Sequence, residues 1–239
     1  MIYPDSMVKN RFANFILFLQ SKTEMKAIVI GGTGATGAYL LQELLASDRI
    51  TSVTALTRRA ISVDHPRLNQ QIVDFEQLED VSISGDLAFS CLGTTRKAAG
   101  SKKAQWRVDH DYQLAFARMA RKANVPVFTL MSSMGSDKNS ALFYSRMKGT
   151  LEEAIIHLDF DHTYIFRPGM LERPGSDRLM ERWVVSLMKG MRRLGMPQKY
   201  GPSHISIVAK AMVAASLNHD DTLKMFDVAD INTLAQEKY

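Results

Sequence analysis

The stretch KAIVIGGTGATGAYLLQELL, residues 26–45, decides the fold. Its apolar start, residues 27–30, is typical of a strand buried on both faces of a parallel sheet. Glycines then recur at every third position, Gly31, Gly34 and Gly37, and the leucines that follow lie on one face of a helix. A strand, a glycine turn and an amphipathic helix in this order predict a unit that binds a dinucleotide.

The glycine turn has a chemical use as well as a structural one. Glycines let the backbone approach a pyrophosphate closely, and the N-terminus of the next helix offers free N–H groups to that anion. The alternative is a tight strand–helix turn of any α/β protein, which the flanking strand and helix disfavour. We expect these residues of the turn to contact the coenzyme: Gly31, Thr33, Gly34, Ala35, Thr36 and Gly37.

The composition fits one large α/β domain. The chain has 239 residues, of which 46% are hydrophobic, so a substantial core is available. Its single cysteine, Cys91, excludes an internal disulfide and predicts a reducing, cytoplasmic location. The net charge of +5 favours anionic ligands, but no basic run interleaved with aromatic residues indicates nucleic-acid binding. The six histidines are scattered, so no metal site is expected.

Residues 1–25 precede the first strand and are interpreted as an N-terminal extension, with the nucleotide-binding domain spanning residues 26–239. Within the extension, residues 12–19, FANFILFL, are strongly apolar, but no run reaches transmembrane length. Three interpretations stay open: an amphipathic helix packed on the domain, a membrane-surface anchor, or an extension upstream of a natural start at Met25.

Two arginines stand where coenzyme specificity is set. The second predicted strand, residues 53–56, is followed by Thr57, Arg58 and Arg59. NAD-binding proteins carry an acidic residue about 20 positions beyond the glycines, which binds the ribose 2′-hydroxyl. Guanidinium groups bind a 2′-phosphate instead, so NADP is predicted in preference to NAD. The alternative is that both arginines are ordinary surface charges after a strand.

The chain alternates strands and helices as far as residue 166, which predicts a doubly wound parallel sheet of the Rossmann type. Beyond that point the alternation loosens, and residues 168–220 are interpreted as a small, partly helical substrate lobe that includes a helix at 177–194. A final strand is expected at 225–228. The other strands are predicted at residues 71–75, 87–92, 127–131 and 163–166.

The carboxyl ends of these strands are expected to line the coenzyme crevice. Asp74 has two equal interpretations, as an acceptor for the adenine amine or as the cap of the next helix. The polar segment 96–103 is expected to be a loop that can close over bound ligand. The predicted coenzyme contacts at these strand ends are Asp74, Phe75, Leu92, Gly93 and Thr94.

Tyr144 and Lys148 are four residues apart, so on a helix they share a face. A lysine ammonium near a phenol lowers the pKa of the phenol and makes it a usable acid or base near neutral pH. A serine beside it can hold a carbonyl oxygen, while the carbon receives hydride and the oxygen receives the tyrosine proton. The Y-x-x-x-K spacing alone is common by chance, but here it follows Ser132 and Ser133 at the end of the fifth strand.

Together the motifs resemble an extended or atypical short-chain dehydrogenase/reductase. They are GGTGATG at 31–37, the serine pair at 132–133, YSRMK at 144–148 and RPG at 167–169. Longer strings are similar to the HIV Tat-interacting oxidoreductase group and its bacterial relatives, from about residue 26 to residue 230. These strings are VDFEQL at 73–78, CLGTTRKAAG at 91–100, VDHDY at 108–112, SSMGSDKNSALFYSRMKG at 132–149 and FRPGML at 166–171.

The resemblance implies an NADPH-binding fold in which Ser133 is the catalytic serine, Tyr144 the acid or base and Lys148 its partner. Tyr144 and Lys148 are expected to touch the coenzyme as well, together with Arg167 and Pro168 at the crevice wall. Related enzymes use an asparagine where this chain has Asp109. Asp109 therefore either serves in its place or caps the helix.

Two functions follow from this interpretation. The leading hypothesis is an NADPH-dependent reductase of a small carbonyl compound. The alternative is an NADPH-sensing regulator that contacts other proteins without turnover, because members of the resembling group are described as regulators as well as reductases. Nothing in the sequence specifies an oligomeric state. Four apolar residues of the lobe suggest either an apolar pocket or a core: Met170, Leu171, Trp183 and Met196.

Overall fold

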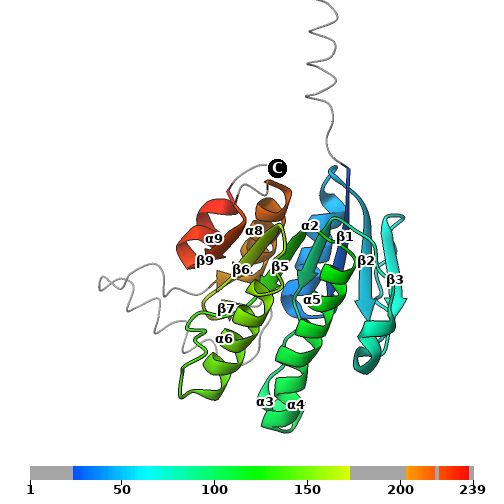
Figure 1. Ribbon diagram of the computed structural model, residues 1–239. Helices are drawn as coiled ribbons and strands as arrows, with labels where there is room; N and C mark the ends of the chain where they lie inside the picture. The colour runs from blue at the N-terminus through cyan, green and yellow to red at the C-terminus, as the bar shows by residue number, and fades with distance from the viewer. Residues whose placement is uncertain (1–23, 173–202, 219–220, 237–239) are drawn as a thin grey trace, which may run out of the picture.

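A seven-stranded parallel sheet forms the centre of the protein (Figure 1). Its strand order is β3-β2-β1-β4-β5-β6-β9, so the order reverses between β1 and β4, the position at which doubly wound sheets bind ligands. This confirms the predicted doubly wound Rossmann fold. The strands are β1 (Met25–Ile30), β2 (Ile50–Thr57), β3 (Leu68–Ile72), β4 (Leu87–Ser90), β5 (Val127–Met131), β6 (His162–Phe166) and β9 (Leu223–Phe226).

The computed structural model describes residues 24–172, 203–218 and 221–236. The predicted extension with its apolar segment 12–19 and the helix predicted at 177–194 lie outside these residues, as do Trp183 and Met196. No helix in the described part of the chain has both the length and the apolar character needed to cross a membrane.

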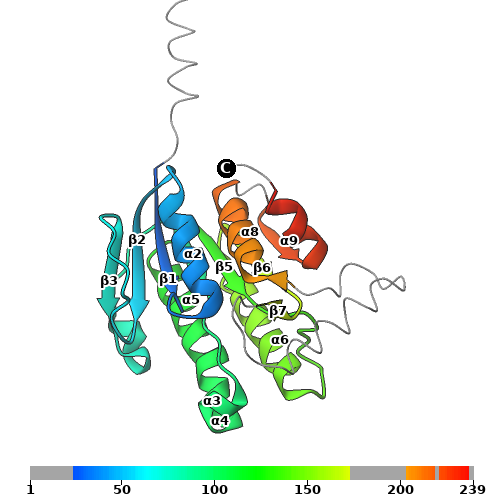
Figure 2. The ribbon, with the colours of Figure 1, turned by 180° about the vertical axis from the view of Figure 1, so that it is seen from behind.

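Helices cover both faces of the sheet. On one face lie α5 (Tyr112–Lys122) and α6 (Phe143–Ile156), in front in Figure 1. On the other lie α2 (Ala35–Ala46) and α8 (Ile205–Asn218), seen in Figure 2, with α9 (Val228–Leu234) beside them. Alternate residues of β1 supply two apolar cores, because successive side chains of a strand point to opposite faces: Ala27 and Val29 join the α2 side, and Ile28 and Ile30 the α5 side.

The predicted substrate lobe is divided in the structure. Residues 205–218, which were assigned to it, form α8, and most of this helix is buried against α2 and the sheet. This helix therefore belongs to the main layer. Two further short strands, β7 (Leu171–Glu172) and β8 (Ser203–His204), pair with each other in a separate parallel sheet.

Two local predictions were wrong. The third strand is β3 at Leu68–Ile72 and not 71–75; it is an edge strand with a mostly exposed, polar sequence, so it carries no strong apolar pattern. The segment 96–103 is not a loop, because it contains α3 (Arg96–Ala99) and the start of α4 (Lys102–Trp106). The hydroxyls of Thr95 and Ser101 cap these two short helices.

Candidate active site

The turn from β1 into α2 leaves no room for a side chain at Gly31 or Gly37. Gly31 has a φ of +79°, and a Cβ there would lie 2.5 Å from the carbonyl carbon of Cys91. A Cβ on Gly37 would lie 2.1 Å from the carbonyl oxygen of Gly31. The Gly34 N–H donates to that same oxygen at 2.9 Å and closes the turn. Gly31 thus lies against the backbone just after β4, and the first turn of α2 lies against Gly31.

The N-terminus of α2 suits an anion. Gly34 stands at its N-cap, and no side chain caps the helix. Thr33 and Gly34 are exposed, Ala35 is half-buried, and Thr36 is buried with Gly37. Amide groups at the start of a helix that no side chain occupies attract a pyrophosphate. The cradle that the glycines form therefore fits the dinucleotide that the sequence predicts.

The coenzyme contacts predicted after β2 and β3 agree with the structure only in part. Arg58 and Arg59 are exposed directly after β2, as an interaction with a 2′-phosphate requires. Asp74 caps the 3-10 helix η1 (Phe75–Asp80) by accepting from the Glu76 N–H at 3.0 Å, which confirms the capping interpretation. The Phe75 side chain is buried, with its ring 5.6 Å from that of Tyr112, so it belongs to the core.

The end of β4 brings three predicted residues to the crevice. Leu92 and Thr94 are half-buried and Gly93 is exposed. The Thr94 N–H donates to both carboxylate oxygens of Asp109, at 3.1 and 3.3 Å. Cys91 is buried one residue after β4, and burial raises its pKa to about 12, so it remains a thiol.

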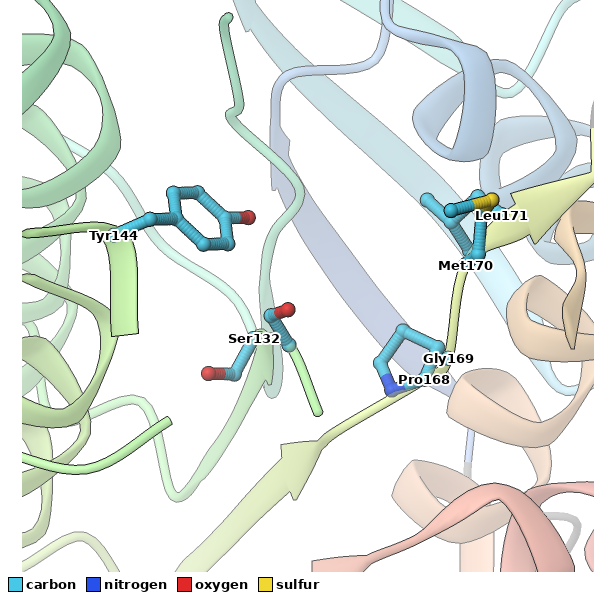
Figure 3. A pocket seen from close by; sticks show the side chains of 7 residues that line it. Ser132, Tyr144, Pro168, Gly169, Met170 and Leu171 are labelled. Atoms are coloured by element: carbon cyan, nitrogen blue, oxygen red, sulfur yellow. The ribbon is translucent and has the colours of Figure 1, made fainter. Parts of the chain in front are cut away.

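Helix α6 places Tyr144 and Lys148 as the spacing predicts. Tyr144 is 43% exposed, and its phenol lies close enough to Ser133 for that side chain to lower the pKa of Tyr144. Figure 3 shows the Tyr144 ring extending from α6 into the cavity that Ser132 also lines. Lys148 lies one turn further along, is only 2% exposed, and has its Nζ atom 3.7 Å from Oδ1 of Asp109. The structure therefore brings Ser133, Tyr144 and Lys148 to one edge of the sheet.

Asp109 lies inside a long helix and does not cap it. The helix begins as α4, passes through one π-helical turn, η2 (Arg107–Asp111), and continues as α5. Asp109 belongs to that turn, and its side chain accepts from the N–H of Thr94, which lies between β4 and α3, and not from the start of its own helix. The capping interpretation of Asp109 is therefore wrong. Single π-helical turns inside α-helices are frequent at functional sites.

Burial and nearby charges shift the pKa values of the site residues. Burial raises the pKa of Tyr144, the negative charge of Asp109 raises it further, and the Ser133 side chain lowers it. Burial also lowers the pKa of Lys148, against the negative charges of Asp109 and Glu152, and raises the pKa of Asp109. The effect of Lys148 on the pKa of Tyr144, which the Y-x-x-x-K spacing predicts, stays a prediction.

Glu152 is a residue that the sequence interpretation missed. It is 2% exposed on α6, and Arg167 donates to it through Nε at 3.1 Å and through its second guanidinium nitrogen at 2.5 Å. Ser132 also donates to Glu152 and lies 3.1 Å from the hydroxyl of Ser136. Arg167, expected at the coenzyme, is thus engaged by Glu152. The sequence could have indicated Glu152, because Glu152 stands four residues beyond Lys148 and therefore on the same face of the helix.

A cavity of about 290 Å³ opens beside Tyr144 (Figure 3). Its described lining contains hydroxyl groups on one side and apolar groups on the other, and no charged side chain. Such a cavity suits a small molecule with a polar group at the hydroxyls and an apolar body. The lining residues are Ser132, Ser133, Tyr144, Pro168, Gly169, Met170 and Leu171.

Comparisons with known proteins agree with this geometry. A family model described as NAD(P)H-binding matches residues 31–182. Protein HTATIP2 of Rattus norvegicus is 37% identical over 205 residues, which cover 83% of this chain and 82% of that protein. Protein fmp52-2, mitochondrial, of Neosartorya fischeri is 33% identical over 232 residues, which cover 91% of this chain and 99% of that protein.

Solved structures share the fold at low identity. MoeE5 in complex with UDP-glucose and NAD superposes with a TM-score of 0.63 at 16% identity, covering 88% of this chain and 80% of that one. The Bordetella bronchiseptica enzyme WbmH in complex with NAD+ gives a TM-score of 0.62 at 15% identity, covering 88% of this chain and 79% of that one.

Proposed function

Because the chain belongs to the NAD(P)H-binding family of short-chain dehydrogenase/reductase-like proteins that includes HTATIP2 and the fmp52 proteins, we propose that it is an NADPH-dependent reductase of a small carbonyl compound. The observation that carries the proposal is the position of the Tyr144 hydroxyl. Tyr144 lines the same cavity as Ser133, no charged side chain is among the described lining, and the buried Lys148 lies one helical turn further along α6.

Each part of the site has a role in this reaction. The glycine loop and the first N–H groups of α2 bind the pyrophosphate of NADPH. The bound coenzyme supplies the hydride that the carbonyl carbon receives. Ser133 donates a hydrogen bond to the carbonyl oxygen, and Tyr144 transfers its phenolic proton to that oxygen. Lys148 stabilises the phenolate that remains, and the apolar side of the cavity excludes water.

A substrate panel tests this function. We expect purified protein to oxidise NADPH in the presence of at least one member of a panel of small aldehydes, ketones and quinones, measured by the loss of NADPH absorbance. The uncharged lining predicts that neutral, apolar carbonyl compounds react faster than matched carboxylated ones. Tight NADPH binding without turnover of any compound would contradict the reductase and favour the second candidate.

The second candidate is an NADPH-sensing protein that binds the dinucleotide and protein partners without turnover. The observation that favours it is the ion pair between Lys148 and Asp109, because this pair occupies the ammonium group that the reductase chemistry requires.

The fmp52 relatives are named as mitochondrial, whereas the single cysteine predicts a cytoplasmic location for this chain. Location therefore stays a prediction.

Coenzyme preference can be tested at Arg58 and Arg59. Removing both guanidinium groups with R58A/R59A is expected to raise the Kd for NADPH by roughly 10- to 100-fold, because a hydrogen bond to a charged group contributes about 1.5–3 kcal/mol. The Kd for NADH, which lacks the 2′-phosphate, should stay within about twofold. Calorimetric titration of both coenzymes measures the two values.

A matched control removes two exposed cations elsewhere. Arg118 and Lys122 lie on α5, so R118A/K122A makes the same change in net charge. It should leave the NADPH affinity unchanged. If R58A/R59A binds NADPH as tightly as this control does, Arg58 and Arg59 are ordinary surface charges.

A further inference from the structure

A second cavity, of about 380 Å³, lies where α4 and the turn η2 meet the first residue of α6. It is larger than the cavity beside Tyr144 and shares no described lining residue with it. The proposed reductase chemistry makes no use of this second cavity. Its described lining combines two aromatic rings with three cationic side chains and one carboxylate: Lys102, Lys103, Trp106, Arg107, Asp111 and Phe143.

Two aromatic rings form the apolar wall of this cavity. Trp106 and Phe143 are half-buried, with their ring centroids 6.1 Å apart and their planes at 54°. The Trp106 ring also lies against His110, with the centroids 4.7 Å apart and the planes tilted by 32°. Because Trp106 contacts a neighbour on its own helix and another on α6, its ring is held in place. The two rings therefore offer a preformed surface to another flat apolar group.

Positive charge surrounds the rings. The Nζ atom of Lys102 lies 5.5 Å from the centroid of the Phe143 ring, and Lys103, the next residue, is exposed. Residues 96–107 contain five arginine and lysine side chains and no acidic one. Within the part of the chain that the structure describes, no ion pair joins either lysine to an acidic side chain. The two lysines are therefore available for an anion.

The other two charged side chains of the lining are paired with neighbours. Arg107 lies 3.1 Å from a carboxylate oxygen of Glu76, and Oδ1 of Asp111 lies 2.8 Å from Nδ1 of His110. The carboxylate of the lining thus has a partner other than the lysines. With three cations against one carboxylate, the lining has a net positive charge that attracts anions and repels cations.

We propose that this cavity is a binding site for a small organic anion with a flat apolar ring system, such as an aryl carboxylate. The ring system packs against Trp106 and Phe143, and the carboxylate receives hydrogen bonds from the ammonium groups of Lys102 and Lys103. The proposal is independent of the reductase function, because none of these residues belongs to the coenzyme or carbonyl site.

The size of the site favours a small molecule over a protein partner. Its volume falls within the range of about 300–1,000 Å³ that is usual for small-molecule sites. A stable protein interface buries about 800 Å² on each partner. Two half-buried rings, of about 150–250 Å² each even when fully counted, supply only a fraction of that area.

The test follows the indole N–H signals by NMR while 2-naphthoate is added to the coenzyme-free full chain. The chain has two tryptophans, and the Trp106 signal is the one that disappears in W106F. We expect a saturable shift of that signal. The neutral analogue 2-naphthamide should bind about three- to tenfold more weakly, because it lacks the charge that the lysines attract. If 2-naphthoate leaves the Trp106 signal unmoved, or binds no better than 2-naphthamide, the proposal is wrong.

A pair of charge variants tests the two lysines. K102Q/K103Q should reduce the affinity for 2-naphthoate to that for 2-naphthamide. The matched control R118Q/K122Q makes the same change in net charge at two exposed positions of α5 and should leave the affinity unchanged. Equal effects of the two double variants would overturn the proposal, because a general attraction of anions by the basic protein would then explain them.

Two other occupants have distinct outcomes. A peptide of sequence EEFEE that shifts the Trp106 signal where 2-naphthoate does not would indicate an acidic protein partner and overturn the proposal. A dimer in light scattering that W106F dissociates would indicate a second copy of the chain and would also overturn it. Because these measurements use neither NADPH nor a carbonyl substrate, a protein that reduces no carbonyl refutes the proposed function without affecting this result.

Discussion

Replacing Tyr144 with phenylalanine is expected to lower kcat for carbonyl reduction by roughly 100- to 10,000-fold, the contribution typical of a general acid. The substitution removes only the hydroxyl of a side chain that lines the cavity together with Ser133. The ring stays in place, so the Kd for NADPH should change by less than about twofold and the free energy of unfolding by less than about 0.5 kcal/mol. Steady-state kinetics, calorimetric titration and thermal unfolding measure the three quantities.

A second hydroxyl deletion serves as the control. Tyr164 lies on β6 and packs edge-on against Phe226, away from the serines and the cavity beside Tyr144. We expect Y164F to retain kcat within about twofold, because general-acid chemistry does not pass through it. A Y144F enzyme that keeps kcat at the level of Y164F would show that the phenol is not the proton donor.

Replacing Gly37 with valine is expected to weaken NADPH binding by at least about 100-fold, because the cradle for the pyrophosphate would have to open. A Cβ there would lie 2.1 Å from the carbonyl oxygen of Gly31 and 2.8 Å from its carbonyl carbon. Both atoms belong to the backbone, so the clash cannot be relieved by a side-chain rotation. The free energy of unfolding should fall by about 1–3 kcal/mol as well.

The loss of stability must be separated from the loss of binding. Gly85 is also crowded, since a Cβ there would lie 2.9 Å from Ile28 and 3.0 Å from the Lys26 carbonyl oxygen, but it lies before β4, at the edge opposite the crevice. We expect G85A to lower the melting temperature and to leave the NADPH affinity intact. If G37V binds NADPH like the wild type, the glycine turn is structural only.

The layered fold could be predicted from the sequence because its central strands are mostly apolar. In β1 and β5 nearly every residue is buried, so a short apolar run marks each strand. The edge strand β3 is mostly exposed and lacks that mark. The short helices after β4 depend on single hydroxyl caps, at Thr95 and Ser101, a signal that is weak within a polar run.

The sequence predicts which residues meet at the site, but it does not predict which charged groups pair there. Motif spacing placed Tyr144, Lys148 and Ser133 together, since all three follow from the α6 pattern and the end of β5. The pairing of Lys148 with Asp109 depends on how η2 and α6 pack, which no local pattern encodes. The ion pair of Glu152 with Arg167 likewise joins two elements that meet only in the folded chain.

The central claim is that the turn between β1 and α2 holds a nicotinamide dinucleotide and thereby presents it to Tyr144. Calorimetric titration of the full chain with NADPH, and in parallel with NADH, tests this claim most directly. We expect saturable binding at one site per chain, with NADPH the tighter ligand. A titration that shows no binding of either coenzyme by the folded protein would contradict the account.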